Sequence, residues 1–334
     1  MINLKNIQHR LWNNAQYKFS IIFSSLYVVL FLGKSYGNKI LLYIIVSILL
    51  SIGIAGIGYV LNDLSDYKDD VINGKRNLFI NLSTFSSIFL TSVFIVLSIF
   101  PWFILPFDYI SLYLIIFEIL LFFFYALPPF RWKEKGFLGV ISDALYAQVV
   151  PCILATYTYS KIENNIRVCT FFLVVYLSWL ILLGIRNILN HQREDFSNDI
   201  STNTNTFVIQ IGIKYAENLI MHVIIPIELA LFSIMLYMLP QSNHLFFYCY
   251  LIYAFVYISK EVIVTKKLSN NSTNWYSFFN RQLLNEFYEI HLPILLLIYF
   301  SYHQSFFIWI LVLNLLIFLP IYIRYTIGFL KKYF

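Results

Sequence analysis

The chain has 334 residues, of which 60% are hydrophobic, 19% are aromatic and only 12% are charged. Soluble globular domains usually carry about 25% charged residues, so this composition excludes a soluble domain and indicates an integral membrane protein. The formal net charge of +6 is expected from loops beside a membrane surface, and we do not take it as a sign of nucleic-acid binding.

Apolar segments long enough to cross a bilayer follow one another along the whole chain. The polar stretch 1–18 shows no cleavable signal pattern and is predicted to be an interfacial lead-in. We predict an all-α fold, a polytopic transmembrane bundle of about nine or ten helices, formed by a single domain over residues 1–334. The predicted spans are 19–33, 40–62, 80–104, 109–127, 138–158, 168–189, 217–239, 244–264, 287–301 and 304–328, and it stays open whether the last two are separate.

The basic residues are distributed unequally between the two sides of this predicted bundle. All of the 23 Lys and Arg residues except Lys34, Lys39, Lys161 and Arg167 fall on the termini or in the loops after even-numbered spans. Because cytoplasmic loops are enriched in Lys and Arg, we expect a protein of the inner or cytoplasmic membrane with both termini in the cytoplasm. The long polar loops then form an active-site cap on that side.

An acidic motif closes the second predicted span. Asn62-Asp63-Leu64-Ser65-Asp66-Tyr67-Lys68-Asp69-Asp70 holds four of the chain's 17 acidic residues. If a helix continues through it, its polar side chains share about one third of the circumference. Carboxylates that close repel one another unless a cation lies among them, and oxygen ligands without His or Cys favour Mg²⁺. The alternative is a solvated helix end at the membrane surface.

A second polar motif follows the sixth span on the same predicted side. Asn187, His191, Asp195 and Asp199 share one face of a helix, and Gln192 and Arg193 lie beside them. Two carboxylate clusters can hold two or more Mg²⁺ ions with a diphosphate between them. The basic residues near the motifs are either phosphate ligands or markers of the cytoplasmic side; they are Lys75, Arg76, Arg131, Lys133 and Arg193.

The pair NDLSDYKDD and HQREDFSND resembles the two Asp-rich motifs of the UbiA superfamily of intramembrane prenyltransferases, as does the connector Tyr125–Lys133 after the fourth span. The resemblance implies that Asn62, Asp66 and Asp70 bind one Mg²⁺ and that Asp195 and Asp199 bind another. His191-Gln192 departs from the family pattern, which often has Asp at the first of these positions. The segments Gly74–Leu78 and Asn203-Thr204 also depart from it, so the chain resembles a divergent branch.

The expected reaction is Mg²⁺-dependent transfer of a prenyl group from a polyprenyl diphosphate to a lipophilic or aromatic acceptor within the lipid bilayer. No protein partner is implied. Asp66, Asp195 and His191 are predicted to be catalytic, with His191 as a base or a hydrogen-bond orienter rather than a Mg²⁺ ligand. The predicted substrate-binding residues are Asp63, Lys75, Arg76, Arg131, Lys133, Asp143, Asn187, Gln192 and Arg193.

Three alternatives keep part of this interpretation. A UbiA-like terpene cyclase would use the same site without a separate acceptor. A transporter with an acidic cytoplasmic site would need ionisable residues near the middle of the membrane, and an inactive protein would retain only the fold.

Glu118 and Glu228 lie inside predicted spans and are interpreted as buried hydrogen-bonded acids or snorkelling acids.

Overall fold

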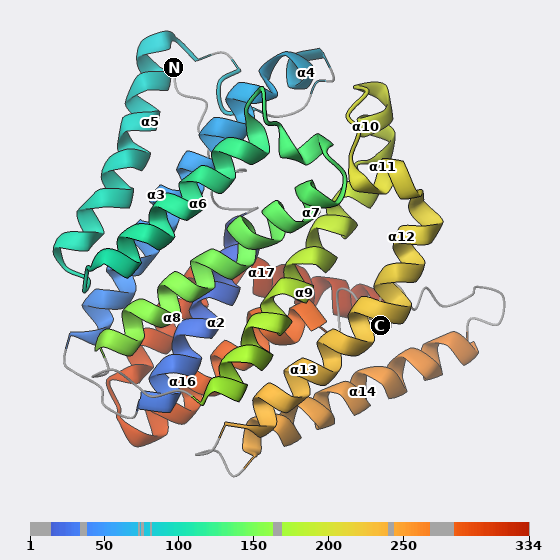
Figure 1. Ribbon diagram of the computed structural model, residues 1–334. Helices are drawn as coiled ribbons and strands as arrows, with labels where there is room; N and C mark the ends of the chain where they lie inside the picture. The colour runs from blue at the N-terminus through green and yellow to red at the C-terminus, as the bar shows by residue number, and fades with distance from the viewer. Residues whose placement is uncertain are drawn as a thin grey trace. The chain divides into compact units, whose positions relative to one another are not determined.

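The computed structural model describes residues 15–33, 39–72, 74, 77–80, 82–162, 169–239, 244–267 and 284–333. Within these ranges every regular element is helical and no strand occurs (Figure 1). The all-α prediction is therefore confirmed.

In the described part of the chain, seven helices are long and apolar enough to cross a membrane. They are α3 (Ile40–Ser65), α5 with η2 (Thr84–Phe103), α6 (Tyr109–Ala126), the run α7–η4–α8 (Phe137–Ile162), α9 (Thr170–Glu194), the run α12–η5–α13 (Ile213–Tyr237) and most of α17 (Phe307–Tyr333). Shorter apolar helices are α2 (Ala15–Gly33), α14 (Leu245–Lys267) and α16 (Leu292–His303), which follows η7 (Phe287–His291). The last two predicted spans are thus separate helices, α16 and α17.

The chain separates into two compact units. The first comprises Met1–Ile166 and Leu180–Asn218, and the second comprises Arg167–Trp179 and Leu219–Phe334. Both Asp-rich motifs belong to the first unit, as do the short elements α4 (Tyr67–Ile72), η3 (Trp132–Glu134), α10 (Phe196–Ser201) and α11 (Phe207–Ile211). Figure 1 shows α4 and α10 at the same end of this unit.

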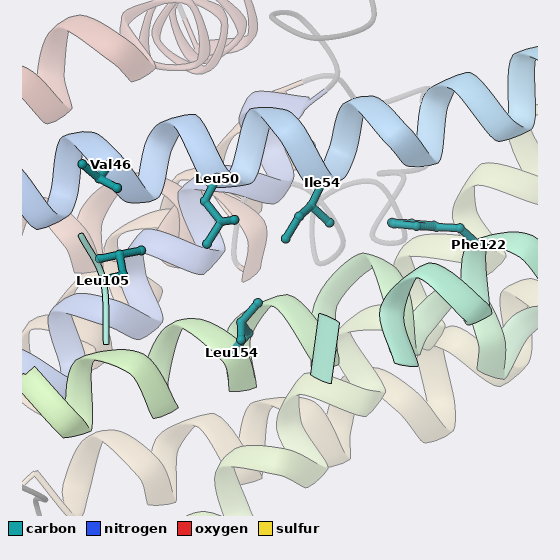
Figure 2. Packing of buried hydrophobic residues seen from close by; sticks show 6 residues of the cluster. All are labelled: Val46, Leu50, Ile54, Leu105, Phe122 and Leu154. Carbon is teal, nitrogen blue, oxygen red and sulfur yellow. The ribbon is translucent and has the colours of Figure 1, made fainter. Parts of the chain in front are cut away.

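Apolar side chains from several helices form the core of the first unit. In Figure 2, Leu50 and Ile54 of α3 point toward Leu154 of α8. Helices α3 and α5 approach closely because Gly53 has no side chain. A Cβ at this position would lie only 2.4 Å from the backbone nitrogen of Ser98. This close approach fixes α3, which carries the first motif at its end.

The second unit contains an aromatic core and paired buried acids. The ring centroids of Phe232 and Tyr288 lie 4.3 Å apart. Glu286 is buried and accepts a hydrogen bond of 2.6 Å from the Tyr257 hydroxyl, as expected because buried polar groups are usually hydrogen-bonded.

Candidate active site

Each Asp-rich motif interrupts a long helix at a single aspartate. Helix α3 ends at Ser65 and α4 begins at Tyr67, so Asp66 lies between them, with φ −96° and ψ 5°. Helix α9 ends at Glu194 and α10 begins at Phe196, and Asp195 lies between them with φ −91° and ψ 3°. The helix therefore does not run unbroken through the first motif, which closes α3. Asp favours such breaks because its side chain competes for backbone hydrogen bonds.

The helical hydrogen-bond pattern nevertheless continues across both breaks. The Asp66 amide donates to the Asn62 carbonyl at 2.9 Å, and the Asp195 amide donates to the His191 carbonyl at 3.0 Å. After α4 and α10, Gly74 and Asn203 have positive φ values of 62° and 53°, a region that Gly and Asn adopt most readily. The two motifs are thus two copies of one local structure.

Buried side chains hold the loop that follows each copy. The Asp63 carboxylate accepts a hydrogen bond of 2.8 Å from the Leu78 amide, and the Gln192 side-chain oxygen accepts one of 3.2 Å from the Val208 amide. Asp63 and Gln192 are both buried. Asp63 thus supports the segment at Leu78, and Gln192 supports the first turn of α11, although both were predicted to bind substrate.

Two of the predicted basic residues lie against the first motif. The Lys133 ammonium group contacts the Asp66 carboxylate. Nη2 of Arg131 lies 3.6 Å from Asp66 Oδ1 and 3.7 Å from Asp69 Oδ2, and its Nε contacts Glu134. The connector after α6 thus brings two cations to the first acidic motif and partly offsets its negative charge.

Two other predicted substrate-binding residues, Arg193 and Asn187, lie on α9. Arg193 forms an ion pair of 3.0 Å with Glu217. Asn187 is half-buried. Lys75 and Arg76 lie outside the described residues.

A cavity of about 220 Å³ joins the two motifs, because Asn62 of the first and His191 of the second both line it. Helix α3 contributes a stripe at helical spacing: Ser47, Leu50, Ser51, Ile54, Ala55, Gly58, Tyr59 and Asn62. At 1.5 Å per residue, this stripe is about 22 Å long. Near its far end, the hydroxyls of Ser47 and Tyr159 are hydrogen-bonded at 3.1 Å. The result is an elongated cavity, and its end that is lined by Asn62 and His191 of the two motifs is called the acidic motif end.

Polar groups at this end come from both motifs and from the fifth predicted span. Asn62 of the first motif, His191 of the second and Asp143 of α7 all line the cavity. The Tyr146 hydroxyl contacts Asp143, and the Tyr125 and Tyr146 ring centroids are 5.1 Å apart. Asp143, Tyr125 and Tyr146 all line the cavity.

Glu118 also lines this cavity, although it was predicted only to be a buried or snorkelling acid. Ser47, Ser51 and Tyr125 line it as well and were not predicted to do so. The signal that was available for α3 was a stripe of small and polar side chains at helical spacing within an otherwise apolar span.

The donor chemistry at the motif end suits a hard divalent cation, because Asn62, Asp66, Asp70, Asp195 and Asp199 offer side-chain oxygens. Among the described residues, no group of three or more His, Cys, Asp or Glu is arranged to hold a metal ion. The fit to Mg²⁺ therefore rests on the type of donor, since Mg²⁺ commonly keeps several waters and completes its coordination with substrate phosphates.

Comparison with solved structures identifies the fold of this chain. No family model matches the sequence, and no curated protein matches it. The structure is similar to that of a UbiA homolog from Archaeoglobus fulgidus bound to DMAPP and Mg²⁺, with a TM-score of 0.54 and 15% identity, over 85% of this chain and 98% of the homolog. The GPP- and Mg²⁺-bound structure of that homolog gives a TM-score of 0.53 and 16% identity over the same shares. The chain thus has the fold of this UbiA homolog, and its long apolar helices indicate an integral membrane protein.

Proposed function

We propose that the protein catalyses Mg²⁺-dependent transfer of a prenyl group from a polyprenyl diphosphate to a lipophilic or aromatic acceptor within the membrane. The observation that carries this proposal is the single elongated cavity lined by Asn62 and His191, one from each acidic motif. The A. fulgidus homolog of the same fold binds DMAPP or GPP together with Mg²⁺, which supports a prenyl diphosphate as the substrate.

The diphosphate binds at the acidic motif end in this proposal. Asn62, Asp66 and Asp70 would hold Mg²⁺ on one side, and Asp195 and Asp199 on the other. When bound, Mg²⁺ neutralises the charge that develops on the leaving diphosphate. Arg131 and Lys133 lie against the first motif, which supports a role for both in binding phosphate oxygens, and Lys75 and Arg76 stay predicted phosphate ligands.

The prenyl tail would lie along the α3 stripe. Leu50 and Ile54 belong both to the cavity wall and to the apolar core, so the tail would be kept out of water. Exclusion of water limits capture of the allylic cation by solvent. The length of the stripe, about 22 Å from Ser47 to Asn62, suits an extended chain better than a compact metabolite.

The acceptor would meet the reacting carbon near Asp143 and Tyr146. The Asp143 carboxylate and Tyr146 hydroxyl are in contact and line the cavity, so they can orient a polar group of the acceptor. The 68% exposure of the His191 side chain and the 3.9 Å between its Nε2 and Asp195 support a role as a base or orienter. We assign Asp63 and Gln192 to support of the segments that follow the motifs, because both are buried and accept backbone hydrogen bonds there.

The Lys and Arg distribution supports an orientation with the acidic motif end and both termini in the cytoplasm.

The test uses the purified protein in lipid nanodiscs with geranylgeranyl diphosphate and membrane lipid extract. We expect diphosphate release that requires Mg²⁺, and a prenylated lipid detectable by mass spectrometry. Asp66→Ala and Asp195→Ala should each abolish the release, whereas Glu217→Gln, which changes a carboxylate outside both motifs, should not. Release that persists in both Ala variants would refute the assignment, and a terpene hydrocarbon or alcohol formed without lipid extract would identify a cyclase.

A further inference from the structure

A buried polar side chain in the segment after each acidic motif donates a hydrogen bond to the last aspartate of that motif. Nδ2 of Asn77 donates a hydrogen bond of 2.8 Å to Asp70 Oδ2. Oγ1 of Thr206 donates one of 3.0 Å to Asp199 Oδ2. Asn77 is completely buried and Thr206 is 7% exposed. The two donors come from different residue types but occupy matching positions in the two copies of the local structure.

The orientation of the Asn77 amide is fixed by its other contacts. Its Oδ1 accepts a hydrogen bond of 3.0 Å from the Phe79 amide, and its Nδ2 also donates to the Asp63 carbonyl at 2.7 Å. A flipped amide would place an acceptor against both the carbonyl and the carboxylate. Asn77 therefore presents a donor to Asp70 and has no equally good alternative arrangement.

Thr206 uses its hydroxyl for the aspartate although a helix begins beside it. Thr206 occupies the N-cap position of α11, where Thr side chains commonly accept a bond from a backbone amide. It makes no such side-chain cap bond, and its hydroxyl donates to Asp199 instead. The Thr206 hydroxyl therefore binds the Asp199 carboxylate instead of capping α11.

We propose that Asn77 and Thr206 are positioning residues that orient the Asp70 and Asp199 carboxylates for divalent metal binding. The inference rests on the proposed function, in which these two aspartates are ligands. A carboxylate has two oxygens, and a donor that binds one of them sets the direction in which the other can face a metal. Hydrogen-bond partners of this kind orient metal ligands, and their removal commonly weakens metal affinity about 10- to 100-fold.

The decisive variants are Thr206→Val, which keeps the side-chain shape but removes the donor, and Thr206→Ser, which keeps the donor. Asn77→Leu removes the second donor. Thr204→Val is the matched control, because the Thr204 hydroxyl lies in the same loop but pairs with Thr202 at 2.8 Å. Mn²⁺ serves as the probe and is titrated by electron paramagnetic resonance in the presence of inorganic diphosphate, without any prenyl substrate.

We expect Thr206→Val and Asn77→Leu to weaken Mn²⁺ binding about 10- to 100-fold and to raise the Mg²⁺ concentration for half-maximal diphosphate release by a similar factor. Thr206→Ser and Thr204→Val should behave like the unchanged protein. Unchanged Mn²⁺ affinity in Thr206→Val, or equal losses in Thr206→Val and Thr204→Val, would overturn the inference.

The Val and Ser variants at position 206 decide the question if Asn77→Leu does not fold. The two proposals fail in different ways. If the unchanged protein shows no Mg²⁺-dependent release yet binds Mn²⁺ in a manner that needs the Thr206 hydroxyl, the proposed reaction is wrong and the positioning role stands.

Discussion

Asp66 and Lys133 offer a test that separates stability from metal binding. Replacing Asp66 with Ala removes the carboxylate that contacts the Lys133 ammonium group, and the Lys133 side chain is only 10% exposed. Removing one partner of a buried ion pair typically costs 3–5 kcal/mol, because the remaining charge is left buried. Since the Asp66 side chain is 20% exposed, we expect the lower end, about 3 kcal/mol.

The double variant Asp66→Ala with Lys133→Met removes both charges. It should recover most of the lost stability, because no buried ammonium group remains without a partner, and the two changes should not be additive. It should not recover Mg²⁺-dependent diphosphate release, because the proposed metal ligand is still absent. The assays are the apparent melting temperature in detergent and diphosphate release at a temperature where all variants are folded.

Recovery of activity together with stability in the double variant would refute our reasoning, since it would show that Asp66 acts only by compensating Lys133. Lys133→Met alone is the control for the loss of a cation at the phosphate site. It should retain Mg²⁺-dependent release but need more diphosphate substrate.

Three further predictions address other parts of the first unit. Asp63→Ala should lower the free energy of unfolding by about 1–3 kcal/mol, because the buried Leu78 amide loses its acceptor; unchanged denaturant stability would contradict this. The Lys161 side chain beside Asp108 lowers the pKa of that carboxyl below its ordinary 3.8, so the contact stabilises above pH 3.8 and weakens as the pH falls further. Asp108→Asn should therefore lower the melting temperature more at pH 7 than at pH 3, and an equal effect at both would be evidence against it. Ala55→Phe, which fills the cavity wall, should reduce turnover of geranylgeranyl diphosphate about tenfold relative to geranyl diphosphate; equal losses would argue against our placement of the tail.

The sequence by itself determined the helices and the two motifs. Apolar length and helical spacing are local properties, so the predicted spans correspond to helices in the structure, and α3 and α9 end at the acidic motifs as expected. The pairing of NDLSDYKDD with HQREDFSND was enough to indicate the UbiA fold that the structural comparison shows.

The tertiary structure decided which polar side chains meet. Arg131 and Arg193 are alike in the sequence, yet Arg131 lies against Asp66 and Arg193 pairs with Glu217. Nothing in the residue types marks Asn77 and Thr206 as equivalent, because their shared role depends on where each loop returns in space. Each donor lies seven residues after its aspartate, but this spacing alone does not show that the chain returns to the carboxylate. Side-chain contacts across loops are set by the path of the backbone and by burial.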